Sequence, residues 1–297
     1  MSALKRTALL VALAALAFPV AAGQSTSCDG WPTEPPCYGI RPGALHHTQD
    51  ATDCTTGFPL TNGTALFFTV AAHCVHRVDQ SLWWFFPSPE LATLDYAEME
   101  ARPPDARVVF IDPAFDAAAY RAVDDTALVE LLPHAWPWFD PTLPAWGSIQ
   151  GMAEAPSTGP HRIYGHGAGY HGTPAEGRVG FGAAWQSDGT FLAHIPGDVG
   201  DSGAPILDEQ GRAVGFAAQQ NLVDPSTPDG VLRGVTLAHA LERLRAYDAL
   251  WLADRVPDAA PAAEEPQPEP TEVDAPLPGP VALLGLVIVS AVLRRRA

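Results

Sequence analysis

Two short stretches of this sequence point to the same chemistry: Gly200-Asp201-Ser202-Gly203 and, far upstream, Val70-Ala71-Ala72-His73-Cys74. A serine hydroxyl is a poor nucleophile near neutral pH, so it needs a base within hydrogen-bond reach and a carboxylate that orients this base. A suitable carboxylate, Asp125, lies between the two stretches. The order His, Asp, Ser therefore makes His73, Asp125 and Ser202 candidates for a general base, its orienting group and a nucleophile.

The local setting of each residue fits its role. His73 follows an apolar run, and Asp125, with Asp124 as the alternative, stands at the mouth of another apolar run. Gly200 permits a tight turn that can aim the N–H groups of Gly200 and Ser202 at a developing oxyanion. Taken singly, these residues would be a structural histidine, a capping aspartate and a turn serine. Their joint occurrence favours the catalytic interpretation.

Short apolar runs separated by Pro, Gly and Asp predict an all-β fold. The first set of runs occupies residues 58–60, 65–70, 82–86, 107–111 and 127–132, and a second set runs from 162 to about 235. A crossing rich in Pro and Trp, residues 133–146, separates two expected lobes. Only residues 237–253 have the periodicity of a helix, which we expect at the end of the folded part.

The two ends of the chain predict export. Residues 1–23 combine Lys5 and Arg6, an apolar run and small residues near Ala22, which is typical of a secretory signal peptide. Residues 257–280 are rich in Pro, Ala and Glu and are expected to form an extended linker. Residues 281–297 are an apolar run ended by three arginines, which predicts a C-terminal membrane anchor or a processed sorting tail. The expected location is extracellular or at the cell surface.

The overall charge bears on the expected partners. The formal net charge is −17, and Lys5 is the only lysine. Such an acidic chain argues against nucleic acid as a partner. No motif predicts a cofactor, and none is expected.

Cysteine and histidine raise the alternative of a metal site. Cys28, Cys37, Cys54 and Cys74 allow two disulfides with three possible connectivities in an exported chain. A metal site is the alternative, because four histidines lie nearby: His46, His47, His73 and His76. The chain has no zinc-type Cys-x-x-Cys pair, so we expect no metal. Three further histidines recur every five residues in a glycine-rich stretch and are interpreted as loop residues: His161, His166 and His171.

The region from Cys54-Thr55-Thr56-Gly57-Phe58 through Val70-Ala71-Ala72-His73-Cys74 is similar to the chymotrypsin-like serine proteases, in the bacterial branch that contains alpha-lytic protease and the streptogrisins. Residues 165–173 also resemble this branch, and the likeness covers roughly residues 40–253. It implies two antiparallel six-stranded β-barrels with the active site between them, followed by a C-terminal helix. The shared cysteine spacing implies a Cys54–Cys74 disulfide, which leaves Cys28–Cys37 to tie down residues 24–39 ahead of a protease domain at 40–256.

The resemblance also places residues around the substrate. It implies that the pocket is formed at Pro196, Ala218, Gln220 and Gly234. Pro196 stands where an acid would select basic side chains, so a preference for Arg or Lys is not expected. We expect a preference for small or apolar side chains instead.

A buried Asp201 requires a positive partner. In trypsin-type relatives a newly cut N-terminus supplies the charge, but this chain has Ile40-Arg41-Pro42-Gly43 where that sequence would be. We predict that Arg162 pairs with Asp201 instead.

These observations predict a secreted or surface-tethered serine endopeptidase that hydrolyses polypeptides through an acyl-enzyme. The alternative is a catalytically inactive relative that binds peptides or proteins at the cell surface, because the strand at residues 213–220 carries Ala218 and Gln219 where trypsin-type relatives carry Ser-Trp.

Overall fold

The computed structural model describes residues 38–257, apart from short gaps at 51, 86–90, 92–93, 145, 155–158, 166–175 and 220–230. The chain divides into two compact units, Met1–Pro261 and Ala262–Ala297, and every described residue belongs to the first. The expected signal peptide, the Cys28–Cys37 pair, most of the linker and the C-terminal apolar run lie outside the described residues. Within the described part of the chain, no helix is long and apolar enough to cross a bilayer.

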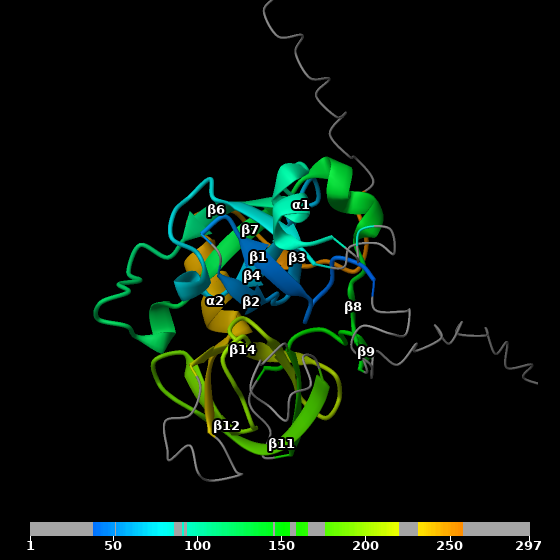
Figure 1. Ribbon diagram of the computed structural model, residues 1–297. Helices are drawn as coiled ribbons and strands as arrows, with labels where there is room; N and C mark the ends of the chain where they lie inside the picture. The colour runs from blue at the N-terminus through cyan, green and yellow to red at the C-terminus, as the bar shows by residue number, and fades with distance from the viewer. Residues whose placement is uncertain are drawn as a thin grey trace, which may run out of the picture. The chain divides into compact units, whose positions relative to one another are not determined.

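The N-terminal half forms an eight-stranded antiparallel sheet (Figure 1). In spatial order its strands are β16 (Trp251–Leu252), β3 (Pro59–Thr61), β4 (Leu66–Val70), β7 (Ala127–Leu131), β6 (Ala106–Ile111), β5 (Ser81–Trp84), β1 (Leu45–Thr48) and β2 (Asp53–Thr55). Its core is made of alternate residues of the central strands, including Leu66, Phe68, Val108 and Val129, packed against Trp84. Burying these side chains stabilises the sheet because apolar surface leaves water.

The C-terminal half is a closed six-stranded barrel. Its strands, in order around the barrel, are β10 (Pro160–Gly165), β11 (Glu176–Trp185), β12 (Thr190–His194), β15 (Leu232–Thr236), β14 (Ala213–Gln219) and β13 (Pro205–Leu207). Its interior is filled by Ile163, Phe191, Ile206, Val214 and Leu232.

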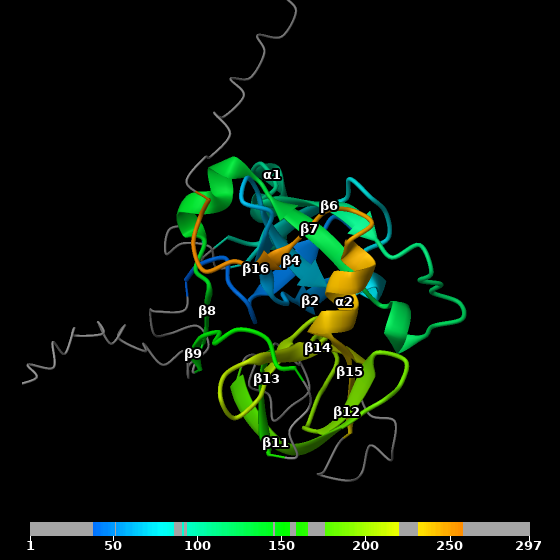
Figure 2. The same ribbon diagram turned by 180° about the vertical axis from the view of Figure 1, so that it is seen from behind.

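A third apolar cluster lies where the sheet, the barrel and the C-terminal helix meet. Phe58 from the N-terminal half packs with Tyr164 and Phe216 of the barrel and with Leu237 of α2 (Leu237–Leu244). Figure 2 shows α2 above the barrel strands β14 and β15. The two halves therefore share this third cluster, in addition to the separate core of each half.

The remaining elements are short. They are η1 (Ala72–Cys74), α1 (Tyr96–Ala101), η2 (Ala122–Asp124), η3 (Pro133–Trp138), β8 (Thr142–Leu143) and β9 (Gly147–Ser148).

The predicted all-β class is confirmed, with two differences in detail. Two closed six-stranded barrels were expected, but only the second half has this form. In the first half the edge strand β2 hydrogen-bonds to a loop of the other half, since the Thr55 N–H donates to the Ser202 carbonyl oxygen at 2.9 Å. The edge of this sheet is thus used to hold the loop that carries the predicted nucleophile.

The second difference concerns the helix expected at residues 237–253, which ends at Leu244. The chain then turns, and Trp251–Leu252 pairs with the edge of β3 as β16. Asp248 in this turn accepts a hydrogen bond of 2.6 Å from the Asn62 side chain. Pairing an exposed strand edge is the physical reason why the apolar residues near 250 leave the helix.

Candidate active site

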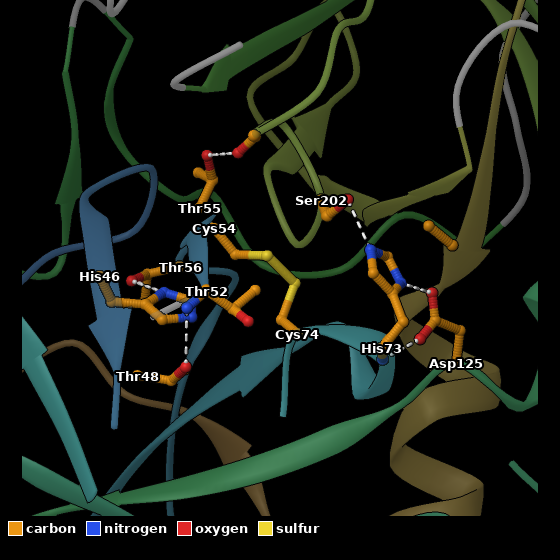
Figure 3. Close-up of a disulfide and its surroundings, with 12 residues drawn as sticks. His46, Thr48, Thr52, Cys54, Thr55, Thr56, His73, Cys74, Asp125 and Ser202 are labelled. Atoms are coloured by element: carbon orange, nitrogen blue, oxygen red, sulfur yellow. Dashed lines mark hydrogen bonds and ion pairs between the residues drawn. A yellow bond between two sulfur atoms is a disulfide. The ribbon is translucent and has the colours of Figure 1, made fainter. Parts of the chain in front are cut away.

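His73 lies in η1, the single turn that follows the buried strand β4. The next residue, Cys74, forms a disulfide with Cys54 of β2, with Cα atoms 6.3 Å apart. The imidazole is partly accessible, with 31% of its side-chain surface exposed. The strand and the disulfide hold the backbone on both sides of His73, while the ring remains open to a reaction partner (Figure 3).

Asp125 is brought to His73 by the pairing of β4 with β7. Val70 faces Ala127 in this pair, so the residues just beyond β4 meet those just before β7. The carboxylate is fully buried. Its Oδ2 is 2.7 Å from His73 Nδ1, and its Oδ1 accepts a hydrogen bond of 2.9 Å from the His73 backbone N–H. The rival residue Asp124 instead pairs with Arg121.

Ser202 lies on the loop between β12 and β13, and its Oγ is 2.7 Å from His73 Nε2. A carboxylate can only accept, so the Nδ1 proton of His73 points to Asp125 and Nε2 is left to accept from the serine hydroxyl. Figure 3 shows the ring of His73 between Ser202 and Asp125. The structure thus brings together the three residues that the sequence singled out.

The loop of Ser202 is anchored to the other half of the molecule by Thr55. The Thr55 hydroxyl donates to the Gly200 carbonyl oxygen at 2.7 Å, in addition to the backbone bond to Ser202. Gly203 has φ of +90°, and a Cβ there would lie 2.1 Å from the Thr55 carbonyl oxygen. Only glycine allows this close approach of the two backbones.

The two N–H groups predicted to bind an oxyanion belong to Gly200 and Ser202. Gly200 has φ of +102°, which glycine adopts readily. Within the described part of the chain, neither N–H has a hydrogen-bond acceptor. Both are therefore available to an oxygen that carries negative charge.

The predicted pairing of Asp201 with Arg162 is wrong, because the counter-charge comes from Arg178 on β11. Both side chains are almost fully buried, and two guanidinium nitrogens face the two carboxylate oxygens, with Nη1 2.6 Å from Oδ2. The same Nη1 also donates to the Pro196 carbonyl oxygen at 2.9 Å. A buried carboxylate is stable when it is paired in this bidentate way.

Strand register explains the difference between the two arginines. Arg162 faces Val179, and Ile163 faces Arg178, in the β10–β11 pair. Paired residues project to the same side, so Arg178 shares the inner side with the buried Ile163, whereas Arg162 lies on the outer side. There the Arg162 guanidinium stacks over Trp146, 5.1 Å from the ring centroid.

Tyr120 is a residue of this site that sequence reasoning missed. Its hydroxyl is 2.7 Å from Asp125 Oδ2 and 2.5 Å from the Ala218 carbonyl oxygen. Its ring meets the His73 ring edge-on, with centroids 5.7 Å apart. Burial and the neighbouring Asp125 carboxylate raise the pKa of Tyr120 well above its ordinary value, so the phenol keeps its proton.

The predicted pocket residues have mixed surroundings. Ala218 is buried, and Pro196 is half-buried with its carbonyl oxygen bonded to Arg178. A Cβ at Gly234 would lie 2.3 Å from the Phe191 ring, so this glycine faces the filled interior of the barrel. Gln220 lies outside the described residues.

Of the histidines that the sequence singled out, His46, His47 and His161 contact other groups. The Cys54 and Cys74 sulfurs, which lie near His73, are bonded to each other and offer no thiolate. His46 Nδ1 lies 3.2 Å from the Thr56 hydroxyl, whereas His47 lies between Asp53 and Glu100, and His76 is exposed. His161 is buried beside the Gly159 carbonyl, and His166 and His171 lie outside the described residues.

Comparisons with known proteins give similarity in structure. No protein-family model matches the chain, and no curated protein matches it in sequence. Among solved structures, protease A of Thermobifida fusca is 16% identical with a TM-score of 0.46, over 72% of this chain and 98% of that one. A glutamic acid-specific serine protease is 16% identical with a TM-score of 0.47, over 72% of this chain and 100% of that one. An alpha-lytic protease homologue, N4, is 16% identical with a TM-score of 0.45, over 72% of this chain and 99% of that one. Similarity at this level assigns no function, so function has to come from the geometry of the site.

Proposed function

We propose that this chain is a serine endopeptidase that cleaves peptide bonds through an acyl-enzyme. The observation that carries the proposal is the continuous hydrogen-bonded line from Ser202 Oγ through the two ring nitrogens of His73 to the buried carboxylate of Asp125. Both contacts are 2.7 Å, within the range expected for a nucleophile, its base and the group that orients the base.

The chemistry follows from which atoms donate and which accept. Ser202 Oγ attacks the carbonyl carbon of the scissile bond while its proton passes to His73 Nε2. Asp125 stabilises the resulting imidazolium and holds its orientation. The oxyanion forms beside the N–H groups of Gly200 and Ser202, and each such donor contributes about 3–4 kcal/mol to the transition state. Imidazolium then gives its proton to the leaving amine, and water releases the acyl group by the same route.

We infer that the site becomes competent without a cut at Ile40. Asp201 already has an internal counter-charge in Arg178, so no new N-terminus is needed to neutralise it. Ile40 is fully buried, and its N–H donates to the Trp138 carbonyl oxygen at 2.8 Å. These two contacts support a protease whose active conformation is built into the barrel.

The proposed substrates are polypeptides with a small or apolar residue at the primary pocket. Pro196 brings no charge, and the nearby Asp201 carboxylate is engaged by Arg178, which argues against selection of Arg or Lys. The proposed location is outside the cell, free or tethered by residues 281–297. The Cys54–Cys74 disulfide supports it because such bonds persist in oxidising compartments.

The test is covalent labelling with a fluorophosphonate probe, which reacts only with an activated serine. We expect labelling of the purified protein, none of Ser202→Ala, and strongly reduced labelling of Asp125→Asn. Ser148→Ala is the matched control, because this exposed serine on β9 lies outside the triad, and it should label like the unmodified protein. If the folded protein does not label under varied conditions, the alternative of a peptide-binding module replaces the proposal. Cleavage of a peptide library would then define the pocket of an active protein.

A further inference from the structure

The hydroxyl of Tyr120 lies between two oxygen atoms that both accept hydrogen bonds. One is Asp125 Oδ2, at 2.7 Å, and the other is the Ala218 carbonyl oxygen, at 2.5 Å. Tyr120 follows the loop of residues 113–119, which is exposed apart from Phe115 and leads from β6 towards η2. This loop thus brings a phenol to the rear of the triad, on the side of Asp125 that faces β14.

A phenol has a single proton, so it can donate fully to only one of these two oxygens. When the proton points to Ala218, the phenol oxygen and Asp125 Oδ2 face each other with lone pairs, which is unfavourable. When it points to Asp125, the Ala218 carbonyl loses the phenol as a donor. The two acceptors therefore compete for one proton.

The strand at Ala218 is irregular at this point. The pairing of β14 with β15 shifts register between Ala217 and Gln219, so Ala218 has no paired residue on β15. A residue left out of a ladder by a bulge is free to direct its backbone groups elsewhere. On its other side β14 pairs with β13 only as far as Phe216, so Ala218 lies beyond the last residue of that ladder. An extended peptide lying beside this end of β14 can offer an N–H to the Ala218 carbonyl, as peptides do when they add to an unpaired strand.

We propose that Tyr120 is a positioning residue that couples substrate binding at Ala218 to the orientation of Asp125, an inference that rests on the proposed protease function. In the free enzyme its proton is shared between Ala218 and Asp125. A substrate N–H that binds Ala218 satisfies this carbonyl, and the tyrosine proton then turns to Asp125. Asp125 is thereby held most firmly when a peptide is in place, and His73 with it.

Among the described residues, few charged groups lie around the hydroxyl. Asp125 is the nearest, Arg233 on β15 contributes a weaker positive field, and the His73 ring lies edge-on. Asp124 also lies close in the sequence, but its carboxylate is paired with Arg121. The proton of Tyr120 therefore responds chiefly to Asp125 and to whatever binds at Ala218.

Tyr120→Phe tests the inference because it removes the hydroxyl and keeps the ring. Tyr96→Phe is the matched control: the Tyr96 hydroxyl also donates to an aspartate, Asp53, at 2.9 Å, on α1. We expect kcat of Tyr120→Phe to fall about tenfold or more, the scale of a lost hydrogen bond to a charged group. KM should stay equal or fall, because nothing competes with substrate for Ala218. The acidic limb of kcat/KM should move to higher pH, because the Asp125 carboxylate then acts on the imidazolium alone. Tyr96→Phe should change none of these.

A second measurement tests the role of Tyr120 without requiring turnover of a substrate. The proton on His73 Nδ1, which is bonded to Asp125, should give a low-field NMR signal that shifts in Tyr120→Phe and not in Tyr96→Phe. Thermal unfolding of both variants checks that they fold. If Tyr120→Phe matches Tyr96→Phe in rate, pH profile and NMR signal, Tyr120 has no positioning role. An unmodified protein that shows neither labelling nor cleavage would instead overturn the proposed function, while the NMR signal still reports on Tyr120.

Discussion

The Thr55 hydroxyl donates a hydrogen bond of 2.7 Å to the carbonyl oxygen of Gly200. Thr55 belongs to the N-terminal sheet, and Gly200 belongs to the loop of the nucleophile in the C-terminal half. Cys54, the neighbour of Thr55, is bonded to the neighbour of His73. The strand β2 therefore holds the base on one side and the nucleophile on the other, and its contacts can be tested one at a time.

Replacing Thr55 with Val removes this hydrogen bond and keeps the shape of the buried side chain. The loop of Ser202 retains its backbone bond to residue 55 but loses one anchor at Gly200. We expect the rate of fluorophosphonate labelling to fall about fivefold, the scale of a neutral hydrogen bond. Thr64→Val is the control, since the exposed Thr64 hydroxyl donates to the Asn62 side chain at 2.9 Å, away from the loop of Ser202. Equal labelling of both variants would show that the anchor is dispensable.

Loss of the Arg178 charge should be far more damaging than loss of Arg162. Arg178→Met leaves Asp201 buried without its partner, which costs about 3–5 kcal/mol of unfolding free energy. It should also abolish labelling, because Asp201 directly precedes the nucleophile. Within the described part of the chain, Arg162→Met removes a stacking contact with Trp146 on the outer side of the barrel, and this variant should retain stability and labelling. Denaturant unfolding and labelling of both variants measure this difference, and similar losses in the two would contradict the role given to Arg178.

The disulfide should contribute to both stability and reactivity. Cys54 and Cys74 are 20 residues apart, and closing a loop of this size stabilises a fold by roughly 3 kcal/mol in the chain-entropy view. We expect Cys54→Ser/Cys74→Ser to lower the unfolding free energy by about this amount and to slow labelling. Reducing the unmodified protein should have the same effect. A double variant that labels at the original rate would show that β4 alone positions His73.

Much of the triad could be predicted because its residues stand in local motifs. His73 follows a buried strand and Asp125 precedes one, and the pairing of these two strands brings them together. Gly200 could be predicted as part of a tight turn, because glycine adopts the required backbone conformation readily. Each of these features depends on residues that are adjacent in the sequence, so the sequence alone indicates it.

The counter-charge could not be predicted, because it depends on register and on an alternation that is reversed. In β11 the arginine at 178 is buried, whereas Val179 and Phe181 are exposed by 48% and 67%. Hydrophobic alternation would place these apolar side chains inside and Arg178 outside. The need of Asp201 for a partner overrides this pattern, and only the three-dimensional structure reveals it.

Tyr120 escaped prediction for a different reason. It ends a loop without periodicity, and its partners are a side chain five residues ahead and a carbonyl on a distant strand. The contact of β2 with the loop of Ser202 could not be predicted either, since the sequence does not show that the edge of this strand pairs with a loop instead of a strand. Contacts that depend on two irregular segments leave no pattern in either one.

His161 should make the stability of the fold depend on pH. It is fully buried, its Nδ1 lies 3.0 Å from the Gly159 carbonyl oxygen, and within the described residues its Nε2 has no hydrogen-bond partner. Burial lowers the pKa of His161 below its ordinary value, although the Gly159 carbonyl and the Asp208 and Glu209 carboxylates oppose this shift. The unfolded chain therefore binds a proton at a higher pH than the folded protein does. The contribution of neutral His161 to the free energy of unfolding is complete above the pKa that the residue has in the unfolded chain. This contribution is lost as the pH falls through the lower pKa that the residue has in the folded protein.

His161→Asn, which cannot ionise, isolates this contribution. We expect the unfolding free energy of the unmodified protein to drop more steeply than that of His161→Asn as the pH falls below about 6.5, the ordinary histidine value. Denaturant unfolding at a series of pH values measures both slopes. His134→Asn, at an exposed position in η3, controls for the loss of any histidine and should follow the unmodified protein. Parallel curves for His161→Asn and the unmodified protein would contradict this prediction. They would mean that His161 binds its proton equally well in the folded and unfolded chains, because an acceptor or a water molecule satisfies the charged form of the buried ring.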